Sequence, residues 1–398
     1  MSGKPARLLR VGVFVGTRAD LGPVLPVIHA LDDAGDVEVH VLTGVSYTAD
    51  ALAALLSPTG SPQGWAGRVH ALADPIRSVT MAEVLGHGPL VAAGAARVLA
   101  DVRPDVVVVL GDRWELLYLV PQVFLAGVPI VHLHGGEVTE GAVDERIRHA
   151  VTKLADQHCV ASQDAARRLR QMGEPAERVH VTGAPGLDRL AGVRPLDDAA
   201  LSQLLGVEVV RPIALFTYHP PTADPGAPVG RWAADALAAC TARCGTVVAT
   251  HPGMDTGRDE VLAALADAAR HEAHLVVVEA LGREYPRVLA SVDVVVGNSS
   301  SGVIEAASVG LPVVDVGDRQ RGRLRGANVV DVGEGRDEVA RGLETALDPA
   351  FVRAARNVVN PYGRGGAATR VADRVRLAPG VSRVKPFVDT QEGICDPA

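Results

Sequence analysis

The chain has 398 residues, which is long enough for two domains of ordinary size. Hydrophobic residues make up 47% and aromatic residues only 3%, so the core must consist of valine, leucine and alanine, as in parallel strands buried between alanine-rich helices. The net charge of −8 argues against a nucleic-acid or anionic-membrane partner. An anionic ligand would therefore need a local cluster of arginine and histidine.

The N-terminus runs directly into a predicted strand, without an apolar segment followed by a cleavage site. No apolar run approaches the roughly 18 residues of a membrane-spanning helix. The four cysteines are scattered, at Cys159, Cys240, Cys244 and Cys395. Cys240 and Cys244 are four residues apart on a predicted helix, but no second Cys/His pair lies nearby to complete a zinc site. We therefore expect a cytoplasmic protein with reduced thiols, no metal and no cofactor.

Short β-branched runs alternate with Ala/Leu-rich helical patterns, which is typical of βαβ units and a parallel sheet. The strands predicted in the first half are Leu8–Val15, Val37–Leu42, Asp105–Leu110, Pro129–Leu133, His158–Ala161 and Arg178–Thr182. The helices predicted between them include Leu21–Asp33, Ala82–Asp101, Glu115–Leu125 and Asp144–Ala155. The strands predicted in the second half are Ile213–Tyr218, Thr246–Thr250, Leu275–Glu279, Val292–Val296 and Pro312–Val316.

The turn-rich segment Gly183–Asp197 indicates a domain boundary. We predict an α/β protein of two doubly wound, Rossmann-like domains, residues 1–185 and 186–365, that face each other across a cleft. A final helix within residues 366–380 is expected to pack back on the N-terminal domain, followed by a tail, 381–398. Open α/β sheets bind ligands outside the carboxyl ends of their strands, so the site is expected there.

The first strand is followed by Gly16–Asp20, which reads GTRAD. A glycine at a strand-to-helix turn followed by Arg18 suits a phosphate bound at a helix N-terminus. The alternative is an ordinary βα turn in which Asp20 caps the helix. The segment lacks the dinucleotide fingerprint and the Walker pattern.

The segment 110–149 carries the densest set of titratable side chains. Three acids occupy defined places: Asp112 just after a strand, Glu137 in a glycine turn and Asp144 at the start of a helix. Four basic groups lie among them, namely Arg113, His134, Arg148 and His149. Acids and bases at strand ends, beside glycines that let the backbone approach a ligand, indicate proton-transfer chemistry on a bound molecule.

Residues 297–302, GNSSSG, follow a strand and open a helix predicted at Val303–Val309. The hydroxyls of Ser299 and Ser300, together with free backbone N–H groups, suit a pyrophosphate. Glu305, one turn into that helix, suits a ribose diol. The alternative is a serine N-cap with a capping-type glutamate.

Basic residues also follow neighbouring strands of the second half. Residues 317–323 read GDRQRGR, and at least one of these arginines is expected to neutralise phosphate. His-Pro pairs follow two strands, at His219 and His251. Two histidines at the mouth of one sheet favour ligand contact for His219, whereas the role of His251 stays open.

Taken together and in this order, these motifs resemble the UDP-N-acetylglucosamine 2-epimerases, specifically the hydrolysing branch used in sialic-acid-type sugar synthesis. The matching segments are GTRAD (16–20), GDRWE (111–115), HLHGGEVTEGAVDERIRHAVTKLA (132–155), GAPGLD (183–188), YHP (218–220), GNSSSGVIEA (297–306), GDRQRGR (317–323) and NPYG (360–363). The similarity spans roughly residues 8–375, and the motifs typical of the non-hydrolysing branch do not appear.

The resemblance implies a GT-B-like fold and a UDP-sugar substrate, with no cofactor and a homodimer or homotetramer. The residues it places at UDP are Ser299, Ser300, Glu305, Arg319 and His219, with Arg18 reaching across the cleft; Asp20 and Arg113 complete the substrate-binding candidates. The acetamido sugar would face Asp112, Glu137, Asp144 and Arg148. His134 stands where well-known members carry a glutamate, and it is our fifth catalytic candidate.

The first hypothesis is hydrolysing epimerisation: UDP leaves by anti elimination, and water adds to the glycal with inversion at C2, which yields UDP and N-acetylmannosamine. Asp112 or Asp144 would take the C2 proton, and Glu137 or His134 would return one to the other face. A non-hydrolysing UDP-GlcNAc/UDP-ManNAc 2-epimerase and the hydrolysing reaction on a UDP-2,4-diacetamido-trideoxyglucose are the alternatives. A GT-B glycosyltransferase and an inactive UDP-sugar sensor fit the acid-rich segment less well.

Overall fold

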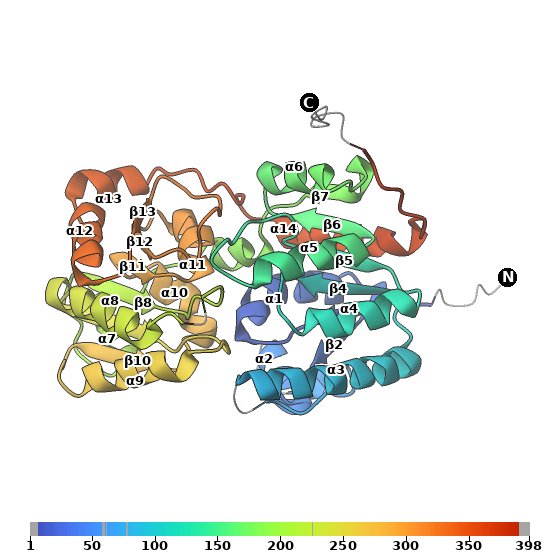
Figure 1. Cartoon of the computed structure of the whole chain (residues 1–398), viewed down its shortest axis with the longest axis horizontal. Coiled ribbons are helices and arrows are strands. Elements are labelled where there is room, and N and C mark those ends of the chain that lie inside the picture. The colour runs from blue at the N-terminus through green and yellow to red at the C-terminus, as the bar shows by residue number, and fades with distance from the viewer. Residues whose placement is uncertain (1–6, 58–59, 61, 77–78, 225, 390–398) are drawn as a thin grey trace. The chain divides into compact units, whose positions relative to one another are not determined.

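A computed structural model describes residues 7–57, 60, 62–76, 79–224 and 226–389. The chain divides into two compact units, each built on one parallel sheet (Figure 1). Unit 1 contains the residues up to Glu137, Asp144–Asp188 and those from Gly365 onward. Unit 2 contains Val138–Val143 and Arg189–Arg364.

Unit 1 alternates strands and helices along the chain. Its elements are β1 (Leu9–Phe14), α1 (Arg18–Asp32), β2 (Val37–Thr43), α2 (Ala49–Leu56), the 3-10 helix η1 (Pro62–Trp65), β3 (Val69–Ala71), α3 (Met81–Val102), β4 (Val106–Leu110), α4 (Leu116–Leu125), β5 (Ile130–Leu133), α5 (Asp144–Leu154), β6 (Gln157–Val160), α6 (Gln163–Gln171), η2 (Ala176–Arg178), β7 (Val179–Val181), η3 (Pro185–Leu190, which crosses into unit 2), α14 (Ala367–Leu377) and η6 (Ala378–Gly380).

Unit 2 repeats the same alternation. Its elements are α7 (Asp198–Leu205), β8 (Ile213–Thr217), α8 (Val229–Arg243), β9 (Thr246–Thr250), α9 (Arg258–Ala269), β10 (Leu275–Val278), η4 (Gly282–Glu284), α10 (Tyr285–Leu289), β11 (Val294–Gly297), α11 (Ser300–Ile304), η5 (Ala306–Val309), β12 (Val313–Val316), β13 (Val329–Val332), α12 (Arg336–Ala346) and α13 (Pro349–Ala355).

Both sheets are doubly wound. The strand order is β3-β2-β1-β4-β5-β6-β7 in unit 1 and β10-β9-β8-β11-β12-β13 in unit 2, and every neighbouring pair is parallel. The winding direction reverses between β1 and β4 in the first sheet and between β8 and β11 in the second. Such a reversal leaves a crevice at the carboxyl ends of the two strands, which is where doubly wound folds bind ligands. The predicted α/β fold class is confirmed.

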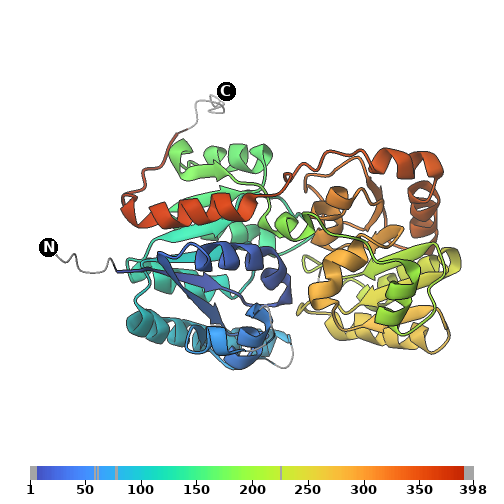
Figure 2. The ribbon, with the colours of Figure 1, turned by 180° about the vertical axis from the view of Figure 1, so that it is seen from behind.

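Helices cover both faces of the first sheet, which explains its continuous valine-rich strands. One face packs against α1, α2 and α14, and the other against α3, α4 and α5. Figures 1 and 2 show these two layers from opposite sides, with α14 and α1 together on one of them. One face of the second sheet packs against α8, α9 and α12, and the small side chains of α8 allow close helix–sheet contact.

Every predicted strand is present, with ends that differ by at most two residues. The helix predicted at Leu21–Asp33 begins three residues earlier, at Arg18. Two edge strands, β3 and β13, were not predicted. Both are short, and β13 is only partly buried, so neither shows the apolar run on which the prediction relied.

The segment Val138–Val143 belongs to unit 2 although the sequence around it belongs to unit 1. The amide of Glu140 donates to the carbonyl oxygen of Arg321 at 3.0 Å, and the carbonyl oxygen of Gly141 accepts from the amide of Ala223 at 3.2 Å. A Cβ on Gly141 would lie 2.4 Å from the carbonyl oxygen of Asp318, so only glycine fits there. A single domain boundary near residue 185 therefore does not account for the place of this segment in unit 2.

The chain returns to unit 1 after unit 2. Helix α14 packs against α1, and the Asp188 carboxylate accepts hydrogen bonds from the first amides of α14, Ala367 at 3.1 Å and Ala368 at 2.7 Å. An aspartate at a helix start satisfies amides that have no partner inside the helix.

Residues 381–389 form a strap along unit 1, held by hydrogen bonds, although the sequence shows no periodicity there. Residues 390–398 of the predicted tail lie outside the described part. The Lys385 ammonium donates to the last carbonyl oxygens of α5 and to the turn after it, at Thr152 (3.2 Å), Lys153 (2.9 Å) and Ala155 (2.7 Å). It also forms a 2.9 Å ion pair with Glu174. A lysine at this position satisfies the carbonyl groups that a helix leaves open at its C-terminus.

Candidate functional site

The turn after β1 brings the motif 16–20 to the crevice of the first sheet. Asp20 is buried, and its carboxylate accepts from the Thr17 amide at 2.7 Å and from the Thr17 hydroxyl at 3.1 Å. The capping alternative therefore describes this carboxylate, because its bonds are made inside its own turn. Arg18 is half-buried at the first position of α1.

Asp112 and Arg148 form an ion pair at the carboxyl end of β4. Gly111 makes the turn with a φ of 72°, and Asp112 follows it. The Arg148 guanidinium is fully buried, and its Nε and Nη2 both donate to Oδ2 of Asp112, the first at 3.0 Å. Its Nη1 donates at 2.8 Å to both the Glu137 carbonyl oxygen and the Glu145 carboxylate. Arg148 thus connects the loops after β4 and β5 to the first turn of α5.

Burial opposes the charge of Arg148, but the surrounding carboxylates of Asp112, Glu137 and Glu145 outweigh it and raise the pKa of the guanidinium. The charge is therefore permanent. His149, the next basic candidate on α5, pairs with Glu145 at 3.1 Å.

His134 and Glu137 form a second acid–base pair in the glycine turn after β5. Nδ1 of His134 lies 2.5 Å from Oε1 of Glu137, and both side chains are largely buried. The backbone of His134 is left-handed, with a φ of 58°. Non-glycine residues adopt this conformation rarely, and such residues gather at functional sites, where the surrounding structure compensates the strain.

Glu115 is a buried carboxyl group that the sequence did not single out. Its side chain is 0% exposed, and within the described residues neither carboxylate oxygen has a hydrogen-bond donor. Oε1 lies 3.6 Å from Nε of Arg113. A Cβ on Gly16 would lie 2.4 Å from the same oxygen, so the glycine of the β1 turn makes room for this carboxyl. The acid in the GDRWE motif was the only available signal.

Electrostatic interactions join these residues into one cluster. Burial raises the pKa of Glu115 to about 7, Arg113 lowers it in part, and Asp20 and Asp144 raise it further. Burial also raises the pKa of Asp20, again opposed by Arg113, while Asp112 adds to the increase. Asp144 is half-buried and is the first residue of α5, as predicted. Unit 1 therefore brings together acids from the ends of β1 and β4 and from the start of α5.

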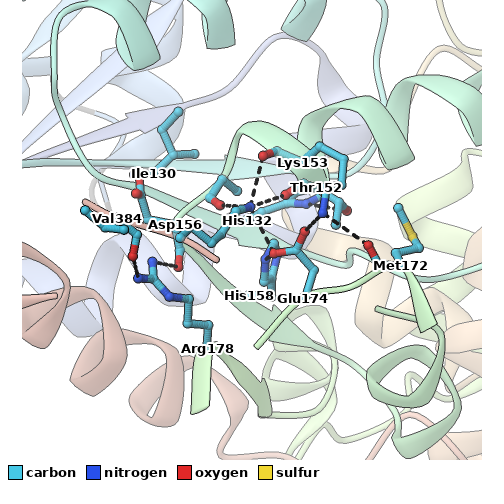
Figure 3. Close-up of polar contacts among 12 residues, drawn as sticks. Ile130, His132, Thr152, Lys153, Asp156, His158, Met172, Glu174, Arg178 and Val384 are labelled. Atoms are coloured by element: carbon cyan, nitrogen blue, oxygen red, sulfur yellow. Dashed lines mark hydrogen bonds and ion pairs between the residues drawn. The ribbon is translucent and has the colours of Figure 1, made fainter. Parts of the chain in front are cut away.

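A second polar cluster, drawn in Figure 3, contacts this site through His132. Nε2 of His132 donates to the Gly111 carbonyl oxygen at 2.8 Å, next to Asp112. The His158 ring lies edge-on to that of His132, and its Nε2 bonds to Glu174 at 3.0 Å. Burial lowers the pKa of His132 to about 3 and also lowers that of His158. Burial alone would raise the pKa of Glu174, but hydrogen bonds from His158, Lys153 and Lys385 lower it to about 2.

This cluster predicts that acid destabilises the fold. Because the folded His132 titrates near pH 3 while an unfolded histidine titrates near 6.5, the stability is complete above pH 6.5 and is lost as the pH falls toward 3. Glu174 adds a loss between its unfolded pKa of 4.5 and about 2. We expect the unfolding free energy to fall by up to about 1.4 kcal/mol per pH unit from His132 alone.

Urea unfolding at pH 7.5, 6.5, 5.5 and 4.5 would measure this slope. His132→Gln should reduce it, whereas His271→Gln, which changes an exposed histidine, should leave it unchanged. Equal slopes for the His132 variant and the unchanged protein would contradict the assignment.

The crevice of the second sheet carries the serine motif. Ser299 is the N-cap of α11, and its hydroxyl accepts from the Ser301 amide at 3.4 Å; Ser300 is the first residue of the helix. The predicted helix Val303–Val309 is wrong, because α11 ends at Ile304 and a 3-10 helix follows. Gly310, with a φ of 67°, ends that second turn. Glu305 lies at the junction of α11 and the 3-10 helix η5, and not one turn inside a longer helix as predicted.

Glu305 lies among residues that the sequence did not single out. Burial raises its pKa to about 7, partly offset by the Arg189 guanidinium and the Tyr285 hydroxyl. The Arg189 guanidinium lies 5.8 Å from the centre of the Tyr285 ring. Arg189 is distant in sequence, and Tyr285 lies in an unremarkable helix start, so no local pattern marked either.

The three arginines of residues 317–323 point to different places and have different partners. Arg319 donates through Nη1 to the Asn298 carbonyl oxygen at 3.0 Å, beside the serine motif. Arg321 is exposed and pairs with Glu140 at 3.2 Å. Arg323 donates to the Gln320 side chain at 3.0 Å. Only Arg319 therefore lies at the crevice of the second sheet, together with His219 after β8.

Two further predictions concern metals and membranes. Among the described residues, no group of three or more His, Cys, Asp or Glu side chains is arranged to hold a metal ion. Cys159, Cys240 and Cys244 are buried free thiols, and Cys395 lies outside the described part. The described helices include none that is long and apolar enough to cross a membrane.

The chain belongs to the family of UDP-N-acetylglucosamine 2-epimerases, whose family model matches residues 64–376. The chain is 32% identical over 374 residues to the UDP-N,N'-diacetylbacillosamine 2-epimerase (hydrolyzing) of Legionella pneumophila. The aligned region covers 94% of this chain and 97% of the relative. It is 28% identical over 328 residues to the UDP-N-acetylglucosamine 2-epimerase of Neisseria meningitidis, over 81% of this chain and 83% of the relative.

A solved structure shares the fold. It is the UDP-GlcNAc 2-epimerase from Neisseria meningitidis bound to UDP-GlcNAc, with a TM-score of 0.75 at 17% identity over 92% of this chain and all of that one. The predicted family and the predicted enzyme class, an epimerase, are thereby confirmed.

Proposed function

We propose that this protein is a hydrolysing 2-epimerase of UDP-linked 2-acetamido sugars. The observation that carries the proposal is the pair of neighbouring acid–base sets in unit 1, Asp112 with Arg148 and His134 with Glu137. A reaction that removes a proton from one face of C2 and returns one to the other needs two such sets. Relatedness over nearly the whole length to a protein named as a hydrolyzing 2-epimerase supports the water-consuming outcome.

The reaction proceeds in two balanced steps. A carboxylate, Asp112 or Asp144, takes the C2 proton, the C1–O bond breaks, and UDP leaves with the bonding electrons to give a glycal. Water then adds its oxygen to C1, while Glu137 or His134 delivers a proton to the opposite face of C2. The proton that water loses returns to the group that donated to C2, and the carboxylate that took the C2 proton releases it to solvent. The products are UDP and the free C2-epimeric sugar.

Unit 2 supplies the nucleotide side of this proposal. Ser299, Ser300, Arg319 and His219 would bind the diphosphate, and Glu305 would accept the ribose hydroxyls. From unit 1, Arg18 and Arg113 complete the set of substrate-binding residues, while the Asp20 carboxylate stabilises the turn that carries Arg18. Cationic and N–H donors at the leaving diphosphate stabilise the charge that develops as the C1–O bond breaks.

We propose the UDP-2,4-diacetamido-trideoxy sugar as a second candidate substrate beside UDP-N-acetylglucosamine. The Legionella relative, named for a diacetylbacillosamine nucleotide, matches at higher identity and over more of the chain than the Neisseria relative. Release of UDP measured with both substrates separates them. A kcat/KM at least tenfold higher for the diacetamido substrate assigns it, and the reverse ratio assigns UDP-N-acetylglucosamine.

Glu305→Ala is expected to weaken UDP binding about 10- to 100-fold, because a hydrogen bond to a charged group contributes about 1.5–3 kcal/mol. Isothermal titration calorimetry with UDP measures the loss. Glu344→Ala, which changes an exposed glutamate of unit 2, is the control and should bind UDP normally. Unchanged affinity of the Glu305 variant would remove this residue from the ribose site.

A further inference from the structure

His219 is anchored through its main chain by a neighbouring strand end. The buried amide of Asn298, just after β11, spans the backbone of His219, just after β8. Its Oδ1 accepts from the His219 amide at 2.6 Å, and its Nδ2 donates to the His219 carbonyl oxygen at 2.8 Å. A backbone N–H only donates and a carbonyl oxygen only accepts, so the orientation of this amide is fixed.

Asn298 also anchors the loop that follows β12. Its own carbonyl oxygen accepts from Nη1 of Arg319 at 3.0 Å and from Nε2 of Gln320 at 2.9 Å. Gln320 is 2% exposed, so these bonds lie inside the protein. One residue therefore joins the loops after three neighbouring strands, β8, β11 and β12, and each of these loops carries a proposed diphosphate ligand.

The imidazole ring of His219 is fixed by a second backbone group. The Gly253 amide, in the loop after β9, donates to Nδ1 of His219 at 2.9 Å. Nδ1 is therefore an acceptor, and the proton of the neutral ring lies on Nε2. A Cβ on Gly253 would lie 3.4 Å from Nδ1, so the backbone approaches the ring closely.

We propose that Asn298 and Gly253 are positioning residues for His219: Asn298 holds its main chain, and the Gly253 amide holds its ring as the Nε2–H tautomer, so that the ring donates a hydrogen bond to an anionic oxygen of the bound diphosphate. A ring with Nδ1 engaged as an acceptor has no lone pair on Nε2, so it cannot take a proton there. A second N–H on Nδ1 would face the Gly253 amide, donor against donor. This inference rests on the proposed function for the identity of the anion and goes beyond it in assigning the tautomer and its two supports.

Nitrogen-15 NMR of the full-length, histidine-labelled protein tests the tautomer, with His219→Gln to assign the signals. We expect Nδ1 to be unprotonated and Nε2 protonated, both without ligand and with UDP. A protonated Nδ1 in the unchanged protein would overturn the proposal. This measurement does not depend on whether variants of Gly253 or Asn298 fold.

Calorimetry with UDP and with uridine tests the consequence, because uridine lacks the diphosphate. Gly253→Pro removes the N–H, and Gly253→Ala keeps it. We expect the proline variant to lose the tautomer preference and to bind UDP about tenfold or more weakly with unchanged uridine binding, and the alanine variant to keep both properties. Asn298→Ala should lower UDP affinity in the same selective way.

Equal loss of UDP and uridine affinity, or an unchanged tautomer in Gly253→Pro, would overturn the inference. Different results would refute the proposed reaction and the inference about His219. A protein that discriminates UDP from uridine as described but has no epimerase activity would refute the proposed reaction alone. An active epimerase whose His219 carries its proton on Nδ1 would refute this inference alone.

Discussion

Asp112→Asn is expected to lower kcat about 10²–10⁴-fold, the usual contribution of a positioned base. The asparagine keeps an oxygen that can accept from the Arg148 guanidinium, so shape and hydrogen-bond geometry are nearly preserved while the charge and the base are lost. UDP release from the sugar substrate under saturating conditions measures kcat. UDP affinity should be unchanged, because the proposed nucleotide ligands that dominate binding lie in unit 2.

Asp101→Asn, which changes an exposed aspartate of α3, is the control for this experiment. More than a tenth of the unchanged rate in Asp112→Asn would mean that Asp112 is not the base. Asp144→Asn would then be expected to show the large loss, since Asp144 is the other carboxylate proposed to take the C2 proton.

Arg148→Met is expected to cost about 3–5 kcal/mol of unfolding free energy and to abolish activity. The side chain is fully buried, and the substitution removes the guanidinium that pairs with the carboxylates of Asp112 and Glu145. Breaking a buried ion pair by removing one partner has a cost of this size. Urea unfolding at neutral pH measures the loss of stability.

Arg146→Met is the matched control, because this arginine lies two residues away on the same helix and is exposed. It should change stability by less than about 0.5 kcal/mol. Arg148→Lys keeps the charge but not the planar fork, so it should recover part of the stability and little of the activity. Equal stability of the two methionine variants would contradict the role assigned to Arg148.

The sequence predicted the parts of the fold that depend on local pattern. The buried valine runs gave the central strands, and their alternation with helices gave the doubly wound sheets. The edge strand β3 lies beyond such reasoning, because three residues show no periodicity and pairing with β2 stabilises them. The strap around Lys385 is likewise set by helix-end carbonyls 230 or more residues away.

The sequence also placed the acids of unit 1 correctly at strand and helix ends, but it did not show their partners. Gly16 and Glu115 are separated by about 100 residues, and only the pairing of β1 with β4 brings the carboxyl under the turn. Asn298 was part of a predicted motif, but the sequence did not show that its side-chain amide bonds to the backbone of His219. The role of Asn298 depends on tertiary contacts between strand ends, which no local pattern shows.

The most direct test of the central claim is incubation of the full-length protein with each UDP-2-acetamido sugar in D₂O, followed by NMR of the products. We expect free UDP and a reducing sugar with inverted configuration at C2 and one deuterium there, because the proton taken from C2 is replaced by one from solvent on the opposite face. A C2-epimeric sugar that remains attached to UDP, or a released sugar with its original configuration and no deuterium at C2, would contradict it.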